Sequence, residues 1–171
     1  MSEVLINKVA ESGIVTIDLE HYFPKEEIVV FDIKDYLFMG LILKEKDFRQ
    51  ALKELDKTTF QQKIVAITCS ADAIIPMWAY MLIATALQHV AVAVMMGDEK
   101  EVAQKLLIQN IQKIDAASYT DKRVVVKGCG ENPIPSAAYL EITNQLLPVV
   151  KSIMYGEPCS TVPVYKSSKA S

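Results

Sequence analysis

Short runs rich in β-branched residues alternate with longer, helix-like segments along most of this chain. The short runs predict strands at residues 14–19, 28–32, 63–68, 90–96, 122–126 and, more briefly, 153–155. The longer segments predict helices at residues 47–55, 74–89, 99–114 and 135–150. In the first of these segments, Phe48, Ala51, Leu52 and Leu55 recur at the spacing of one helix face. Strands and helices in alternation predict an α/β protein.

The strand-like runs are continuously apolar, which is typical of a sheet covered by helices on both faces. We therefore expect a three-layer α/β fold around one mostly parallel central sheet. The first two runs precede the regular alternation and are expected to form an amino-terminal strand or hairpin extension. No internal repeat or linker is evident. Residues 1–165 are predicted to form a single domain, followed by a flexible polar tail at 166–171.

The composition is that of a globular protein, with 171 residues of which 51% are hydrophobic and 23% charged. A net charge of −3 gives the chain no electrostatic reason to bind nucleic acid. The longest apolar stretch, residues 73–88, is shorter than the ~20 residues that cross a bilayer. It predicts a core helix, with Trp78, Tyr80 and Met81 packed inside. Since the amino terminus also lacks an apolar leader, we expect a cytoplasmic protein that binds neither nucleic acid nor membrane.

Three cysteines carry the strongest chemical signal. Cys69 and Cys129 each follow a β-branched run, and Cys159 lies in a turn rich in Pro, Ser and Thr. The loops after parallel strands line the ligand crevice of an open α/β sheet, so we expect the three thiols to gather at the sheet's carboxyl edge. The cysteines form no Cys-x-x-Cys pair and are odd in number, which favours reduced thiols over a disulfide scaffold.

A gathered set of thiols predicts a metal centre. Cys69, Cys129 and Cys159 would bind zinc or an iron–sulfur cluster, and Asp72 or Glu131 would supply a fourth ligand. The separations between the cysteines do not by themselves specify which metal.

Gly128 and Gly130 flank the second cysteine and leave room for a close backbone approach. We expect their amides to approach a sulfur atom or a phosphate. The chain contains neither the dinucleotide-binding glycine pattern nor the P-loop pattern, so nucleotide binding is only weakly indicated.

Two other interpretations of the cysteines stay open. Cys69 or Cys129 would act as a catalytic nucleophile, because each precedes a helix whose amino terminus favours a thiolate. The sequence does not support either of the two histidines, His21 and His89, as the general base for such a nucleophile. Alternatively, the cysteines are small apolar filler in a non-catalytic interaction protein.

Three long stretches of the chain carry further information. They read FDIKDYLFMGLILKEKDFR at 31–49, TCSADAIIP at 68–76 and SIMYGEPCSTVP at 152–163. They resemble an uncharacterised bacterial family, domain of unknown function 2480, and the resemblance extends over nearly the whole chain. It implies a link to sulfur-mobilisation genes for iron–sulfur cluster assembly, and it assigns no functional residue.

The cysteine pattern and this resemblance together favour an accessory protein of iron–sulfur metabolism. We expect iron–sulfur assembly proteins as partners. An apolar face on the amino-terminal arm would also allow a homodimer. Whether the protein is an enzyme stays open at this point.

Overall fold

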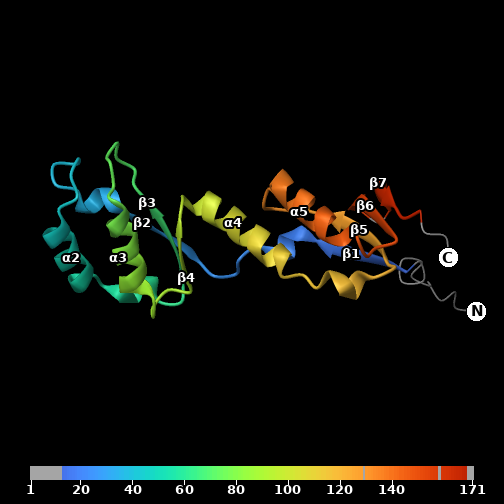
Figure 1. Ribbon diagram of the computed structural model, residues 1–171, viewed down its shortest axis with the longest axis horizontal. Helices are drawn as coiled ribbons and strands as arrows, with labels where there is room; N and C mark the ends of the chain where they lie inside the picture. Colours follow the sequence, from blue (N-terminus) through green and yellow to red (C-terminus); the bar gives the residue numbers. More distant parts are fainter. Residues whose placement is uncertain (1–12, 129, 158, 169–171) are drawn as a thin grey trace, which may run out of the picture. The chain divides into compact units, whose positions relative to one another are not determined.

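The computed structural model describes residues 13–128, 130–157 and 159–168, and its chain divides into two compact units (Figure 1). Residues 24–103 form one of them, which we call the inserted unit. Residues 1–23 and 104–171 form the other, the split unit, whose chain is interrupted by the first. Each unit has its own sheet and its own apolar core.

The inserted unit contains a parallel sheet in the order β2-β3-β4. Its main elements are, in chain order, β2 (Ile28–Asp32), α2 (Glu45–Glu54), β3 (Ile64–Thr68), α3 (Met77–Leu87) and β4 (Ala93–Met96). Two short 3₁₀ helices are also present: η2 (Ile33–Tyr36) follows β2, and η3 (Lys57–Phe60) precedes β3. Parallel neighbours cannot be joined by a tight turn, and α2 and α3 provide the crossovers.

The split unit contains a sheet in the order β1-β5-β6-β7, in which only β7 runs antiparallel to its neighbour. Its elements are β1 (Ile14–Asp18), η1 (Leu19–Tyr22), α4 (Glu99–Gln112), η4 (Ala116–Tyr119), β5 (Arg123–Lys127), α5 (Ser136–Leu146), β6 (Ser152–Glu157) and β7 (Ser160–Lys166). The helix α4 begins in the inserted unit and ends in the split unit.

The two units repeat one architecture. Adding 59 to the residue numbers of η3, β3 and α3 gives the bounds of η4, β5 and α5. Identical residues at this spacing include Pro76 and Pro135, Ala79 and Ala138, Tyr80 and Tyr139, Ile83 and Ile142, and Leu87 and Leu146. The strands β1 and β2 also correspond, since each ends in an aspartate (Asp18 or Asp32) that caps a 3₁₀ helix.

The expectation of no internal repeat is therefore wrong. Only part of the repeat recurs at a constant spacing, because the first strand of the split unit lies ahead of the entire inserted unit. A backbone detail supports the equivalence. Gln62 and Asp121 both adopt a positive φ, 57° and 58°, and their N–H groups donate to the carbonyls of Val90 and Val149 at 3.0 and 2.9 Å.

Both helices of a unit pack on the same face of its sheet. In the split unit, Leu107 and Ile111 of α4 and Ile142 of α5 share one buried cluster with Val124 and Val126. Side chains alternate across a strand, so these two valines lie on one face of β5. The inserted unit has an equivalent cluster that joins α2 and α3 to β2 and β3. The described helices thus give each unit two layers, where the sequence predicts three layers around one sheet.

The continuously apolar strands have a simple cause. Ile64 and Ala66 on the other face of β3, and Val125 on the other face of β5, are buried as well. A strand that is buried on both faces has a continuously apolar sequence. Such a sequence therefore does not require helices of the same unit on both faces.

Several other sequence predictions can be compared with the structure. The strands at 14–19 and 28–32 are confirmed, but they form no hairpin, because β1 pairs with β5 and β2 pairs with β3. The helix expected from residue 74 begins at Met77, after Pro76 in an extended conformation. Lys166, assigned to the tail, ends β7, whereas 169–171 lie outside the described residues.

The sequence does not predict β7, which contains Pro163. A proline cannot donate to the ladder, but β7 is the last strand of its sheet and needs donors toward one neighbour only. Among the described helices, none is long and apolar enough to cross a bilayer.

The core assignment predicts opposite outcomes for two neighbouring residues of α5. Ile142 is fully buried, whereas Leu140 is 66% exposed. We expect Ile142→Ala to lower the free energy of unfolding by about 2–5 kcal/mol through lost burial and a cavity. Leu140→Ala should change it by no more than about 0.5 kcal/mol. Urea denaturation followed by circular dichroism measures both, and equal effects would contradict the assignment.

Candidate functional site

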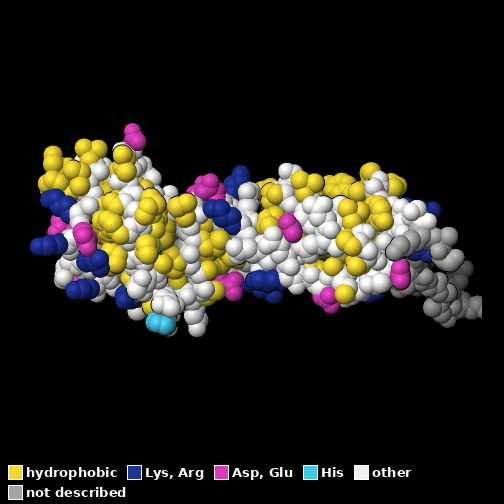
Figure 2. All heavy atoms as spheres, in the orientation of Figure 1, with side chains coloured by type: hydrophobic (Ala, Val, Ile, Leu, Met, Phe, Trp, Pro, Cys, Tyr) yellow, Lys and Arg dark blue, Asp and Glu magenta, His cyan; other side chains and the backbone are white. Residues whose placement is uncertain are grey.

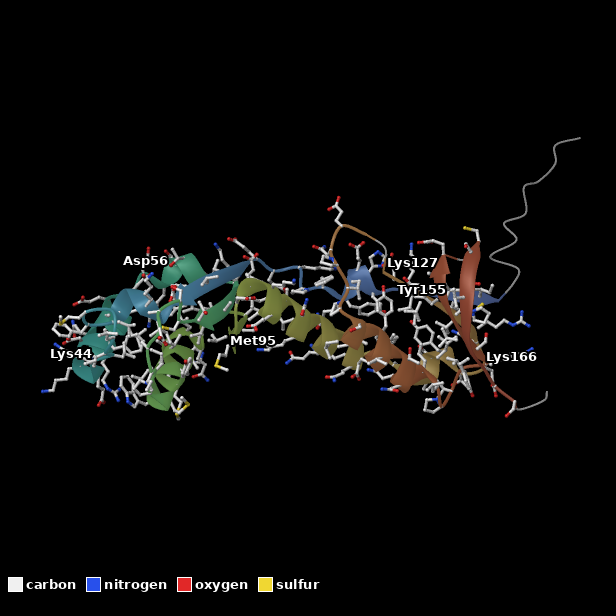
Figure 3. All side chains as sticks on the ribbon, turned by 90° about the horizontal axis from the view of Figure 1, so that it is seen from above. Lys44, Asp56, Met95, Lys127, Tyr155 and Lys166 are labelled. Atoms are coloured by element: carbon white, nitrogen blue, oxygen red, sulfur yellow. The ribbon has the colours of Figure 1, made fainter. Side chains whose placement is uncertain are left out.

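The carboxyl ends of the parallel strands in the split unit carry an ion-pair network. The Nζ atom of Lys127, at the end of β5, lies 3.3 Å from an oxygen of Asp18 and 3.5 Å from an oxygen of Glu157. These acids end the neighbouring strands β1 and β6. The hydrogen bond to Asp18, reinforced by the charge of Glu157, raises the pKa of Lys127. Figure 3 shows Lys127 beside Tyr155 of β6.

The loop that follows β5 is held by the acidic side chain of Glu20. The backbone N–H of Asn132 donates to a carboxylate oxygen of Glu20 at 2.9 Å. A Cβ atom at Gly130 would overlap that carboxylate, and one at Gly128 would lie 2.6 Å from the Tyr139 hydroxyl. Both glycines therefore allow a close approach, as the sequence suggests, but the approaching groups here are a carboxylate and a phenol.

The corresponding edge of the inserted unit is organised by Asp32. Its carboxylate accepts hydrogen bonds from the N–H of Lys34 at 3.0 Å and from the N–H and hydroxyl of Ser70 at 3.0 and 2.5 Å. Partial burial by itself raises the pKa of Asp32, but the bonds from Ser70 and Lys34 outweigh it and the net pKa is lowered. Ser70 is thereby tied to the end of β2.

The described cysteines lie in different units. Cys69 follows β3 in the inserted unit, where its partly buried thiol donates to the carbonyl of Ala71 at 3.6 Å and packs against the core. Cys159 lies in the turn between β6 and β7 of the split unit and is exposed. Cys129 lies outside the described residues. The two described cysteines thus follow strands of two sheets, whereas the sequence predicts a common edge of one sheet.

The remaining predicted ligands are at the surface. Asp72 and Glu131 are exposed, as are His21 and His89. Within residues 13–128, 130–157 and 159–168, no group of three or more His, Cys, Asp or Glu side chains is arranged to hold a metal ion. The metal centre on Cys69, Cys129 and Cys159 stays a prediction, because Cys129 is not among these residues.

The split unit contains an apolar pocket that the sequence analysis did not predict. The pocket has a volume of about 480 Å³ and lies between α5 and the β6–β7 hairpin. The helix contributes Tyr139, Leu140 and Thr143, and the hairpin contributes Met154, Tyr155 and Val164. The rings of Tyr139 and Tyr155 meet edge to face, with their centroids 5.6 Å apart. Concave sites with apolar walls and a few polar groups are the usual form of a binding pocket.

One signal could have revealed this surface from the sequence. A comparison of the chain with itself at a spacing of 59 residues aligns α3 with α5 and shows the aliphatic positions that are identical in both helices, which the structure buries. The remaining apolar positions, such as Leu140 and Met81, then stand out as surface candidates. Met81 is 69% exposed, so the prediction that it packs in the core is wrong, whereas Trp78 and Tyr80 do pack against the core.

Comparison with known proteins identifies the family of the chain. Residues 3–167 match the family model described as protein of unknown function (DUF2480), and the chain belongs to this family. The resemblance stated from the sequence is confirmed. No curated protein and no solved structure matches the chain.

The hydrogen bonds to Asp32 predict a pH-dependent contribution to stability. The lowered pKa means that the ionised carboxylate stabilises the fold above the unfolded pKa of about 3.9, and that this contribution is lost as the pH falls through the folded pKa. Ser70→Ala should raise the pKa of Asp32, and the variant's loss of stability at neutral pH should shrink near pH ~3.

Carboxyl NMR titration and urea denaturation at the two pH values measure these effects. Asp56 is the internal control, since its lowered pKa comes from Thr58 and should not respond to Ser70→Ala. An unchanged Asp32 pKa in the variant would refute the assignment.

Proposed function

We propose that this member of the family is a non-catalytic interaction protein whose split unit binds apolar side chains of a partner protein. The observation that carries the proposal is the pocket between α5 and the β6–β7 hairpin. Leu140, Tyr155 and Val164 line the pocket and expose apolar surface to solvent. Covering such surface is favourable by roughly 25 cal/mol per Å².

The shape of the site supports a protein segment as ligand. The pocket opens at the molecular surface beside further exposed apolar residues of the hairpin, such as Val162. Figure 2 shows apolar side chains gathered over α5 and the β6–β7 hairpin. Interfaces between proteins obtain most of their affinity from a few apolar or aromatic anchors seated in pockets of this kind.

Polar groups at the pocket can orient such a segment. Ser136, Thr143 and Tyr139 lie along one wall, and the hydroxyl of Thr143 donates to the carbonyl of Tyr139 at 2.6 Å. The acids and lysine at the carboxyl edge do not line the pocket, so the proposal involves no ionised group of that network.

A charge placed in the pocket tests the proposal. Peptides selected from a random library against the wild-type protein should contain Leu, Phe or Trp anchors, and Leu140→Glu should weaken their binding about tenfold or more. The matched control is Met81→Glu, the equivalent position of α3, which should leave binding unchanged. Isothermal titration calorimetry gives the dissociation constants. Selected peptides that bind both variants equally well, or an absence of apolar anchors, would refute the proposal.

An accessory role in iron–sulfur metabolism is a second candidate, which we propose on the chemistry of the thiols. Cys159 is exposed, so its sulfur is accessible to a metal. Cys129 and Glu131 belong to the same unit as Cys159 and would complete a zinc or iron–sulfur site with it. Without a metal, Cys69 or Cys129 would remain as a candidate nucleophile.

Metal analysis separates this candidate from the first. Protein purified without air should contain zinc or iron in a fixed ratio to the chain, and Cys159→Ser should lose it, since soft thiolate ligands determine such sites. Met81→Glu serves again as the control and should keep the metal. Protein that contains no metal and accepts no reconstituted cluster would rule out the metal centre.

A further inference from the structure

Among the described strands, β4 is an edge strand of its sheet, whereas its counterpart β6 lies between two strands. In the inserted unit β4 is the last strand after β3, whereas the equivalent strand β6 is followed by β7, which pairs with it antiparallel. The difference arises from the chain that follows. After β6 the chain turns back into a hairpin, and after β4 it enters α4 at Glu99. Within residues 13–128, 130–157 and 159–168, the sheet of the inserted unit therefore has no counterpart of β7.

The side chains around β4 form an apolar surface. Met77, Met81, Val92 and Met96 are 71%, 69%, 56% and 63% exposed. Met77, Met81 and Met96 occupy the positions of Ser136, Leu140 and Tyr155, which line the pocket of the split unit. There Val164 of β7 completes the wall. Met77, Met81 and Met96, which we call the methionine surface, thus correspond to residues of the pocket wall without its outer strand. Figure 2 shows apolar side chains gathered over α3.

The charges on the strands suggest that β4 is covered by another strand. Edge strands that face solvent usually carry lysine or proline, which prevent further pairing. The outer strand β7 of the split unit has both, in Pro163 and Lys166. Residues 90–97, which include β4, contain neither a charge nor a proline.

These features favour a second copy of the chain as the occupant. A two-fold axis perpendicular to the sheet would set two β4 strands antiparallel, the direction that β7 takes along β6. Such an axis brings like residues close together, so a charged strand would repel itself. An uncharged strand flanked by adaptable methionines avoids this cost.

We propose that two copies of the chain associate through β4, pairing antiparallel to form one continuous sheet across both inserted units. Met77, Met81 and Met96 of each copy then lie beside the new strand pair. This interface is separate from the pocket of the split unit, so either proposal can fail without the other.

Sedimentation equilibrium tests the proposal over a concentration range of about 1–100 μM. The wild-type protein should sediment with twice the 19.0 kDa mass of the chain. The double variant Met81→Glu/Met96→Glu places charges on the methionine surface and should sediment as a single chain. Leu140→Glu, at the equivalent position of the split unit, should remain a dimer, and circular dichroism should show that both variants are folded.

Hydrogen exchange locates the contact. Amides of residues 93–96 should be more protected at high than at low protein concentration in the wild type, and not in the double variant. A wild-type protein that sediments as one chain throughout the range, or a double variant that dimerises like it, would overturn the proposal. Protection of these amides in a monomer by a synthetic STVPVYK peptide, the sequence of β7, would instead indicate strand addition from another protein.

Discussion

The fold depends on one packing arrangement that the chain uses twice: a helix whose buried stripe packs on one face of a small, mostly parallel sheet. The stripe consists of Ala79, Ile83 and Leu87 in α3 and of Ala138, Ile142 and Leu146 in α5, all without exposed surface. The spacing of four residues keeps the stripe on one side of the helix. Each buried isoleucine or leucine contributes about 1.5–3 kcal/mol, and the alanine allows the first turn of the helix to approach the sheet closely.

Both helices of a unit pack on one face of its sheet, so other residues complete the edges of the sheet. At the carboxyl ends of the strands, each unit uses the aspartate that ends its first strand. Asp18 pairs with Lys127, whereas Asp32 binds Ser70, so the same architecture carries two different polar networks. At the outer edge, the split unit adds β7 and forms a pocket, and the inserted unit ends at β4. The units are therefore alike in their cores and differ at the surfaces that can meet other molecules.

The sequence predicts the described strands and helices well where the pattern of apolar residues is long and regular. The helix α2 and strands β1, β2, β3 and β5 lie within a few residues of their predicted positions. The strand β7 escapes detection because Pro163 interrupts its pattern, and only a position at the edge of a sheet makes that proline acceptable. The candidate site is predicted less well, because the loop positions of Cys69 and Cys159 are correct but the strands that precede them belong to two sheets.

By itself the sequence determines the order of the elements and the apolar stripes on them, because both follow from the local alternation of residue types. It also contains the repeat, in the matching residues of α3 and α5. Only the tertiary structure decides that the strands divide into two sheets. It also decides that β1 pairs with β5, although the whole inserted unit separates these strands in the sequence. Strand pairing is set by contacts between residues far apart in the chain, and an apolar run has the same sequence whichever partner buries it. The same holds for the pocket, since Leu140 and Tyr155 look like core residues until the position of β7 shows which side chains stay uncovered.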